Sequence, residues 1–255
     1  MSENKISVVI NTYNEEASLA DTLPYLKEFD EIVVCDMEST DDTIKIAQQH
    51  GCKVVTFPKG NYNICEPARD FAIHSASNNW VLVVDADEII TPKLRQYLYN
   101  FIQNEKNIVG LLIPRKNYVM NRFVKNSYPD YQLRFFRQDK ATWKPIIHSK
   151  PILNGTIKKI PSEKAELAII HKSMTIYSRI AKINTYTTNE VTKRENERVC
   201  LLSLFLKPTL RFLKFYLLKG GIFQGISGLT LSVNEANYKF YTLVKIWEAQ
   251  NEKRN

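Results

Sequence analysis

The fold is decided by the stretch Trp80-Val81-Leu82-Val83-Val84-Asp85-Ala86-Asp87-Glu88, in which an apolar run ends in closely spaced acids. A short apolar run is typical of a strand that is buried on both faces, as in a parallel sheet. Asp85 and Asp87 form a D-x-D motif directly after this strand. Divalent cations such as Mg²⁺ or Mn²⁺ prefer oxygen ligands and often share them with a substrate phosphate. The stretch therefore predicts a metal–phosphate site, and the alternative is a solvated acidic turn.

Strand and helix patterns alternate on both sides of this stretch. Apolar runs predict strands, and amphipathic patterns between them predict helices. We expect strands at 5–11, 31–35, 52–57 and 80–84, and helices at 15–28, 41–50 (capped by Ser39 or Thr40) and 67–76. This order predicts an α/β fold with a Rossmann-like, mainly parallel sheet flanked by helices. In such sheets ligands bind beyond the carboxyl ends of the strands.

Three polar turns follow the predicted strands, at 11–15, 36–42 and 85–88. We expect them to converge, because the carboxyl ends of parallel strands share one edge of the sheet. Single residues have structural explanations, since Asn14 and Asp41 could cap helices and Asp36 could close a turn. Together the turns describe a nucleotide pocket with Tyr13 as an aromatic face. No glycine-rich phosphate loop occurs among the eight glycines, which disfavours dinucleotide dehydrogenases and P-loop enzymes.

These motifs resemble a known family. The segment Ser7-Val8-Val9-Ile10-Asn11-Thr12-Tyr13-Asn14-Glu15, the turn at 36–43, Arg69 and the D-x-D motif are similar, in order and separation, to the family 2 inverting glycosyltransferases of GT-A fold. The resemblance implies a UDP-sugar donor and a divalent metal. It also implies donor-binding roles for a set of residues: Asn11, Tyr13, Glu15 and Asp36 around the uridine, Arg69 supporting the donor, Asp85 at the ribose, and Asp87 at the metal and diphosphate.

The chain departs from the family pattern at two places. Met37 and Glu38 stand where a small residue is usual, and Asp70 stands where the family has Asn after the arginine. These departures concern the donor side.

A second segment supplies a candidate catalytic base, Asp130, within Tyr128-Pro129-Asp130-Tyr131-Gln132-Leu133-Arg134-Phe135-Phe136-Arg137. Inverting sugar transfer needs one carboxylate to accept the proton of the attacking hydroxyl. A bound metal would stabilise the leaving phosphate. Asp130 could equally be a turn acid after Pro129.

The same segment resembles a subgroup of the family, the β-1,4-glucosyltransferases of bacterial lipopolysaccharide-core biosynthesis. The matching residues are Asp130, Arg134, Arg137 and His148, whereas Ser149 replaces the usual Glu. His148 is therefore a candidate metal or diphosphate ligand, with a structural hydrogen-bonding role as the alternative. His171, which ends an apolar strand, has the same two interpretations.

Composition and cysteine spacing predict the size class and the cellular location of the protein. The 255 residues, 44% of them hydrophobic and 24% charged, fit one compact domain with an appendage. The four cysteines lack C-x-x-C spacing, which favours reduced thiols and a cytoplasmic location. We expect no signal peptide and no membrane-spanning segment, because the first residues are polar and no apolar run is long enough.

The carboxyl-terminal part carries most of the charge. Residues 172–219 hold ten Lys or Arg against three Glu, in a chain of net charge +8. Within 204–218, Lys207, Arg211 and Lys214 recur at helical spacing among large apolar residues. This pattern predicts an amphipathic helix at a membrane interface, with the basic residues at anionic headgroups. The alternative is a packed helix with a solvated basic edge. Residues 222–250 could form a dimer surface, a membrane surface or core.

The sequence thus predicts a GT-A domain at 1–200 and a C-terminal helical, membrane-associating extension at 201–255. The expected activity is that of a metal-dependent hexosyltransferase that moves glucose or galactose from a UDP-sugar to a lipid-linked or cell-envelope glycan. It would act peripherally at the inner face of the cytoplasmic membrane. The alternatives are an inert membrane-associated scaffold and a sugar nucleotidylyltransferase, although the latter normally has a Gly-rich basic loop. Nucleic-acid binding is disfavoured, because no recognisable module interleaves basic and aromatic residues.

Overall fold

The computed structural model describes residues 4–60, 62, 65–144, 150–174 and 176–252. The chain forms two compact units. The first, here called the sheet unit, consists of Met1–Arg115 and Pro129–His171. The second, called the helical unit, consists of Lys116–Tyr128 and Lys172–Asn255. The helix α5 (Ile176–Lys193), which the sequence-based division assigns to the first domain, packs on α7 (Gly225–Glu252) in the helical unit.

The main sheet confirms the predicted α/β fold. Its strands lie in the order β3 (Lys53–Thr56), β2 (Glu31–Asp36), β1 (Ile6–Thr12), β4 (Trp80–Val83), β8 (Asp130–Arg137), β6 (Ile108–Val119), β12 (Ile169–Met174) and β5 (Glu88–Ile89). The pairs β3–β2, β2–β1 and β1–β4 are parallel. Beyond β4, the strand β8 runs antiparallel to both β4 and β6. Sequence-distant β8 therefore lies directly beside the strand that precedes the D-x-D motif.

Shorter strands pair with β6 in the sheet unit and, at its far end, in the helical unit. β11 (Thr156–Lys159) pairs in parallel with β6, and β7 (Arg122–Phe123) forms a hairpin with the far end of β6. A separate ladder joins β9 (Ala141–Thr142) and β10 (Ile152–Leu153). Single 3₁₀ turns lie at Leu23–Tyr25, Lys125–Ser127, Gln138–Lys140 and Ala165–Leu167.

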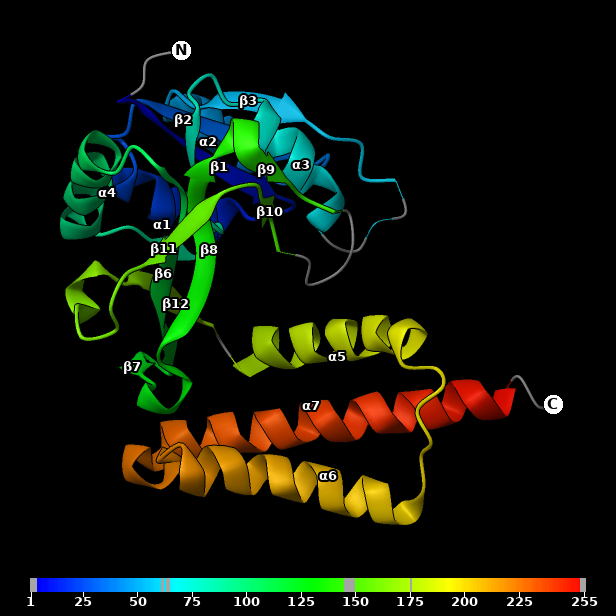
Figure 1. The fold of residues 1–255 in the computed structure, drawn as a ribbon. Coiled ribbons are helices and arrows are strands. Elements are labelled where there is room, and N and C mark those ends of the chain that lie inside the picture. Colours follow the sequence, from blue (N-terminus) through cyan, green and yellow to red (C-terminus); the bar gives the residue numbers. More distant parts are fainter. Residues whose placement is uncertain (1–3, 61, 63–64, 145–149, 175, 253–255) are drawn as a thin grey trace. The chain divides into compact units, whose positions relative to one another are not determined.

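Helices cover both faces of the parallel strands (Figure 1). On one face α1 (Glu16–Thr22), α2 (Thr43–Gln49) and α4 (Pro92–Asn104) pack on a core that includes Val8 and Ile10. On the other face α3 (Glu66–His74) packs on a core that includes Val9. Successive residues of a strand point to opposite faces, so one apolar run supplies both cores.

Two helix boundaries differ from the sequence expectation. The first helix stops at Thr22 because Pro24 enters a 3₁₀ turn. The helix expected at 41–50 begins at Thr43, with Asp42 at the N-cap position. Ser39 and Thr40, expected as its caps, instead bind Asp36 and Asn14. Polar residues that serve a functional turn are thus unavailable to cap the helix after it.

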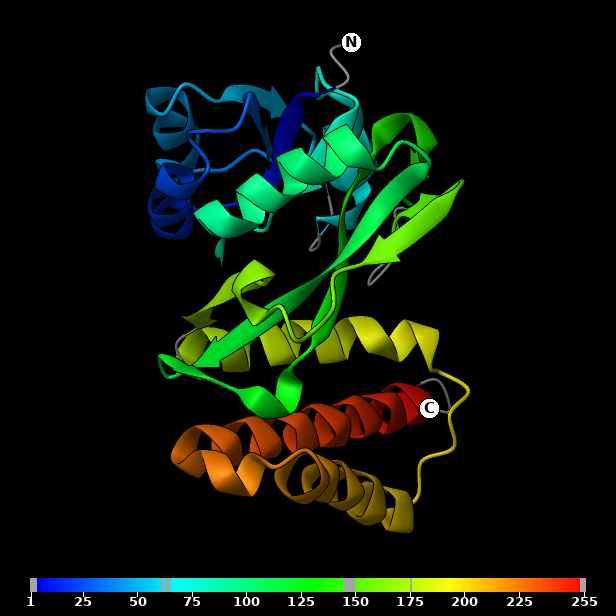
Figure 2. The same cartoon turned by 60° about the vertical axis from the view of Figure 1, so that its left-hand side comes forward.

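The helical unit contains three long helices that lie side by side in both Figure 1 and Figure 2. α6 (Leu201–Leu213) continues into a π-helical turn at Lys214–Leu218. The chain then reverses at Gly220, whose φ of +72° favours glycine, and passes through a 3₁₀ turn at Gly221–Gln224 into α7. A Cβ on Gly228 would clash with the carbonyl oxygen of Gly221, so glycine is required at this contact. Among the described helices, none combines the length and apolar character needed to cross a bilayer.

Candidate active site

The predicted convergence of the three polar turns is confirmed by the strand register. Thr12 of β1 lies beside Asp36 of β2, and Val9 of β1 lies beside Val83 of β4, in parallel ladders. The turns after these strands therefore leave the sheet at the same edge. All the residues discussed below belong to the sheet unit.

Asp36 organises the first two turns from a fully buried position. Its carboxylate accepts hydrogen bonds from the Thr12 hydroxyl (3.0 Å), the Ser39 backbone N–H (2.7 Å) and the Ser39 hydroxyl (2.5 Å). Asn14 links the same turns, because its side-chain oxygen accepts from the backbone N–H of Thr40 at 2.8 Å. The φ of Asn14 is +53°, a left-handed conformation that Asn tolerates better than most residues. Asp36 and Asn14 together fix the shape of this edge.

Three other predicted donor-binding residues line the first turn. Tyr13 is exposed, and the Lys59 ammonium lies 4.5 Å from the centre of its ring. The backbone N–H of Glu15 donates to the Thr43 hydroxyl at 2.9 Å. The side-chain amide of Asn11 is buried without a regular hydrogen-bond partner among the described residues, although it lies beside the Cys35 thiol. Buried amides are normally satisfied, so Asn11 is a group that a ligand at this edge could complete.

The first acid of the D-x-D motif holds two arginines. Asp85 Oδ1 accepts from Arg69 Nη2 at 3.1 Å, and its Oδ2 accepts from Arg134 Nη2. Both arginine side chains are about nine-tenths buried. Burial alone would raise the pKa of Asp85, but Arg134, Arg69 and Arg115 together hold that pKa well below its usual range. Asp85 is therefore an ionised anchor for the arginines that flank the D-x-D turn.

A pH dependence of stability follows from this depressed pKa. Ionised Asp85 stabilises the fold above its usual pKa of 3.8, and the contribution is lost as the pH falls below it. We expect the free energy of unfolding to fall faster for the wild type than for Asp85→Asn, by up to about 1.4 kcal/mol per pH unit in the acid range. Urea unfolding of both proteins from neutral to acid pH measures the difference. A difference that does not change with pH would contradict the ion-pair assignment.

A fully buried acid connects the D-x-D turn to the predicted base. Glu88 Oε2 accepts from the backbone N–H of Asp85 at 3.0 Å, and Glu88 Oε1 accepts from Arg115 Nη1 at 3.0 Å. Arg115 also donates to Asp130 Oδ2, from Nε at 2.9 Å and from Nη2 at 2.7 Å. Burial would lower the pKa of Arg115, but Glu88 and Asp130 raise it, so its charge is fixed. This chain of contacts sets the position of Asp130 relative to the D-x-D turn.

The second acid of the motif faces a histidine. Asp87 Oδ2 lies 3.2 Å from Nε2 of His171, and each side chain is about one-fifth exposed. His171 reaches this place because β12, which carries it, pairs antiparallel with β5 immediately after the D-x-D turn. His148 lies outside the described residues. No group of three or more His, Cys, Asp or Glu side chains that could hold a metal occurs within the described ranges.

Asp70 and Glu38, where the chain departs from the family pattern, both accept hydrogen bonds from backbone groups of other loops. Asp70 Oδ1 accepts the backbone N–H of Trp143 at 2.7 Å, and the Trp143 ring lies 5.0 Å from the Arg69 guanidinium. Glu38 has a φ of +60°, and its carboxylate accepts the backbone N–H of Lys59 at 3.2 Å. Both residues therefore attach neighbouring loops to the edge of the sheet.

Sequence reasoning missed the roles of Glu88 and Arg115. The sequence pattern places Glu88 in the acidic turn without indicating its role, and it gives no sign of a role for Arg115. Arg134 and Arg137 both match the subgroup, but Arg137 pairs with Asp139 and not with Asp85. A usable signal was the alternation of β8, which places Asp130, Gln132 and Arg134 on one face; indeed Gln132 Nε2 donates to Asp130 Oδ1 at 2.8 Å.

Comparison with known proteins identifies the family. The model of glycosyl transferase family 2 matches residues 7–164. This match covers more than half of the chain, which therefore belongs to glycosyl transferase family 2 and is a glycosyltransferase. The predicted family resemblance is thereby confirmed.

Two relatives of the chain are named as glycosyltransferases. The lipopolysaccharide core biosynthesis glycosyltransferase LpsC of Rhizobium meliloti is 25% identical over 252 residues, which are 95% of this chain and 92% of the relative. An uncharacterized glycosyltransferase of Rickettsia conorii is 27% identical over 266 residues, 98% of this chain and 93% of its own. Among solved structures, glucosyl-3-phosphoglycerate synthase of Mycobacterium tuberculosis, in complex with phosphoglyceric acid, matches with 25% identity and a TM-score of 0.37. That match covers 46% of this chain and 44% of the synthase, less than half of either.

Proposed function

We propose that this glycosyltransferase is a metal-dependent, inverting hexosyltransferase that uses a UDP-hexose donor. The observation that supports the proposal is the contact between Asp87 and His171 at the D-x-D turn. From the same turn, Glu88 binds Arg115, which in turn binds Asp130. Groups suited to a diphosphate and a group suited to an acceptor hydroxyl thus both adjoin the D-x-D turn. Family membership supports the transfer of a sugar.

The chemistry of the Asp87–His171 pair fits a divalent cation. A carboxylate oxygen and an imidazole nitrogen 3.2 Å apart are donors that Mn²⁺ accepts, and both are partly exposed. We propose that Asp87 and His171 hold the ion, with substrate phosphate and water completing its coordination. Bound there, the ion would neutralise charge that develops on the leaving diphosphate. Arg69 and Arg134 add fixed positive charge beside the same turn.

Asp130 is the proposed general base. The acceptor hydroxyl would give its proton to an Asp130 oxygen while the hydroxyl oxygen forms a bond to the anomeric carbon and the bond from that carbon to UDP breaks on the opposite face. The configuration at the anomeric carbon inverts, and UDP leaves. About one-third of the Asp130 side chain is exposed, which leaves room for an acceptor to approach. Arg115 and Gln132 orient the carboxylate.

The acceptor is proposed from the relatives. The printed name of the Rhizobium meliloti relative refers to lipopolysaccharide core biosynthesis, and the match to it covers nearly the whole of both chains. We therefore propose a lipid-linked or cell-envelope glycan as the acceptor, modified at the inner face of the cytoplasmic membrane. The donor-side residues proposed are Asn11, Tyr13, Glu15 and Asp36.

Replacement of Asp87 by alanine tests the donor half of the proposal. The purified protein is expected to hydrolyse one UDP-hexose slowly, with Mn²⁺ or Mg²⁺, in preference to GDP-, ADP- and dTDP-sugars. Asp87→Ala should lose at least about a hundredfold of this activity, because it removes a ligand of the proposed ion. Glu105→Ala, which removes a surface acid paired with Lys158, is the control and should hydrolyse the donor normally.

Calorimetric titration with UDP distinguishes the outcomes. Metal-dependent UDP binding that is lost in Asp87→Ala supports the metal site. If no nucleotide sugar binds with any metal, the donor assignment fails and the inert scaffold becomes the better interpretation. If the protein made a nucleotide sugar and did not release UDP from one, the nucleotidylyltransferase alternative would be favoured.

A further inference from the structure

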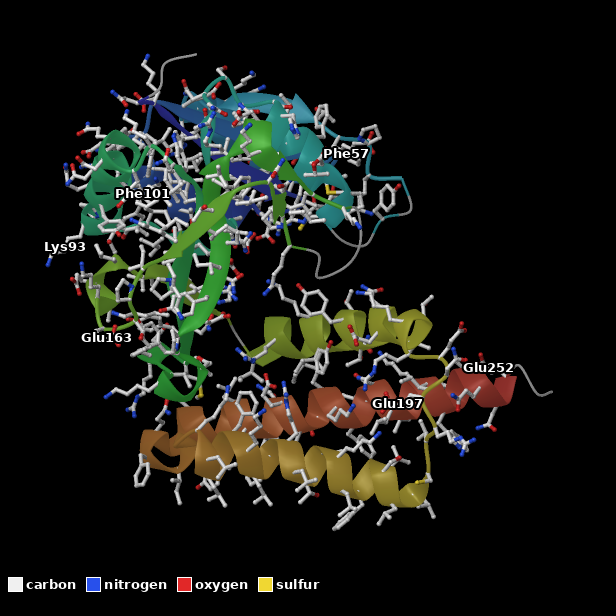
Figure 3. All side chains as sticks on the ribbon, in the orientation of Figure 1. Phe57, Lys93, Phe101, Glu163, Glu197 and Glu252 are labelled. Carbon is white, nitrogen blue, oxygen red and sulfur yellow. The ribbon has the colours of Figure 1, made fainter. Side chains whose placement is uncertain are left out.

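Large apolar side chains on α6, in the turns after it and at the start of α7 are exposed to solvent. The set, here called the apolar ridge, consists of Leu202, Phe205, Leu210, Leu218, Phe223 and Ile226. Leu218 is 85% exposed, Phe223 90% and Ile226 71%. Figure 3 shows that the side chains of α6 on the side turned away from α7 are predominantly carbon. Groups of large, highly exposed apolar side chains often mark a surface that binds a partner or a membrane.

The ridge carries little charge because the basic residues of α6 point elsewhere. Lys207 Nζ lies 2.6 Å from Glu197 Oε1, and Arg211 Nη2 lies 2.6 Å from Glu235 Oε2 on α7. This differs from the sequence expectation, in which Lys207 and Arg211 face lipid headgroups. The basic side of α6 packs against acidic residues of the helical unit, whereas its apolar side chains are exposed to solvent.

The surroundings of the ridge are basic. The sequence contains no Asp or Glu from residue 198 to residue 234, whereas Lys214 and Lys219 occur in this segment. Both lysines are exposed, and neither forms an ion pair within the described part of the chain. The Lys219 ammonium lies 4.4 Å from the ring of Phe215, at the end of the ridge. An anionic surface complements this margin, while a second copy of the chain would bring lysines against lysines.

We propose that the apolar ridge is the face by which the protein inserts into the interface of an anionic bilayer. The ridge side chains would enter the boundary between headgroups and acyl chains, with Lys214 and Lys219 at the phosphates. In this mode of binding the helices would lie in the plane of the membrane. The inference deepens the proposed function, on which it rests for the location of the acceptor. Its binding mode, apolar insertion with a basic margin, is independent of catalysis.

Flotation with lipid vesicles tests the ridge directly. The full-length protein is mixed with vesicles of phosphatidylethanolamine and phosphatidylglycerol, or of phosphatidylcholine alone. The double variant Leu218→Ser/Phe223→Ser is expected to lose at least about tenfold in partitioning to both kinds of vesicle, since two large apolar side chains no longer enter the bilayer. Lys214→Gln should lose about fivefold on the anionic vesicles only. Leu218, Phe223 and Lys214 are all exposed, so neither variant should change the melting temperature.

Two controls separate the ridge from other effects. Tyr25→Ser removes an exposed aromatic side chain of the sheet unit and should bind vesicles like the wild type. Asp87→Ala should also bind normally, so that failure of the catalytic proposal and failure of the ridge proposal give different results. Unchanged vesicle binding by Leu218→Ser/Phe223→Ser would overturn the proposal. A second result would also overturn it: the wild type does not bind vesicles but forms a dimer without lipid, and the double variant abolishes this dimer. Sedimentation velocity detects such a dimer.

Discussion

Replacing Glu88 with alanine is expected to destabilise the sheet unit by about 3–5 kcal/mol, the cost of removing one partner from a buried ion pair. Glu88 is fully buried and accepts hydrogen bonds from Arg115 and from the backbone N–H of Asp85. The substitution leaves that N–H without its acceptor and removes one of the two acids beside Arg115. Urea unfolding monitored by circular dichroism measures the loss. Glu88→Gln, which keeps one of the two oxygen acceptors, should lose less.

The matched control is Glu105→Ala. Glu105 pairs with Lys158 at 2.6 Å, but the pair lies at the surface, with 35% of the Glu105 side chain and 48% of the Lys158 side chain exposed. Surface pairs of this kind contribute about 0–1 kcal/mol. Equal losses for Glu88→Ala and Glu105→Ala would show that the buried network does not stabilise the fold.

The second large effect is expected at the proposed base. Asp130→Asn should lower kcat for donor hydrolysis by about 10²–10⁴, the usual contribution of a general base. Asparagine retains an oxygen that can accept from Arg115 and so preserves the local shape. Binding of UDP, measured by calorimetry, should be unchanged, because the substituted group acts on the attacking hydroxyl. A split between kcat and UDP affinity is therefore the signature of the proposed role.

Asp139→Asn is the control for this substitution. Asp139 lies two residues after the end of β8 and pairs with Arg137 at 3.0 Å, outside the Asp85 network. Asp139→Asn should leave kcat within about twofold of the wild-type value, as expected for a surface residue that takes no part in the reaction. If Asp130→Asn also left kcat unchanged, Asp130 would be an anchor for Arg115 and another group would be the base.

The strands of the parallel half could be predicted closely because a buried parallel strand is a continuous apolar run. The strand expected at 31–35 is found at Glu31–Asp36, and that expected at 80–84 at Trp80–Val83. Helix starts were less predictable, since Ser39 and Thr40 have the composition of caps but bind Asp36 and Asn14. Local propensity does not reveal which of two partners a short polar side chain will choose.

The candidate site was predictable where its residues follow strands and not where tertiary pairing brings them together. The D-x-D turn and the turns after β1 and β2 could be placed at one edge from strand order alone. Arg115 joins Asp130 because β6 and β8 are antiparallel with these two residues opposite each other. His171 joins Asp87 through the β12–β5 pairing. Long-range register of this kind has no signature in a single sequence.

The twofold attachment of Asp85 has a further consequence for recognition. A free arginine side chain has about 2 kcal/mol of rotamer entropy, which it loses when it is fixed on a ligand. Arg69 and Arg134 are already immobilised on the two oxygens of Asp85 and are nearly buried. They lose this freedom when the chain folds, so the diphosphate of the proposed donor would meet a rigid pair of cations, and its affinity would not be reduced by ordering them.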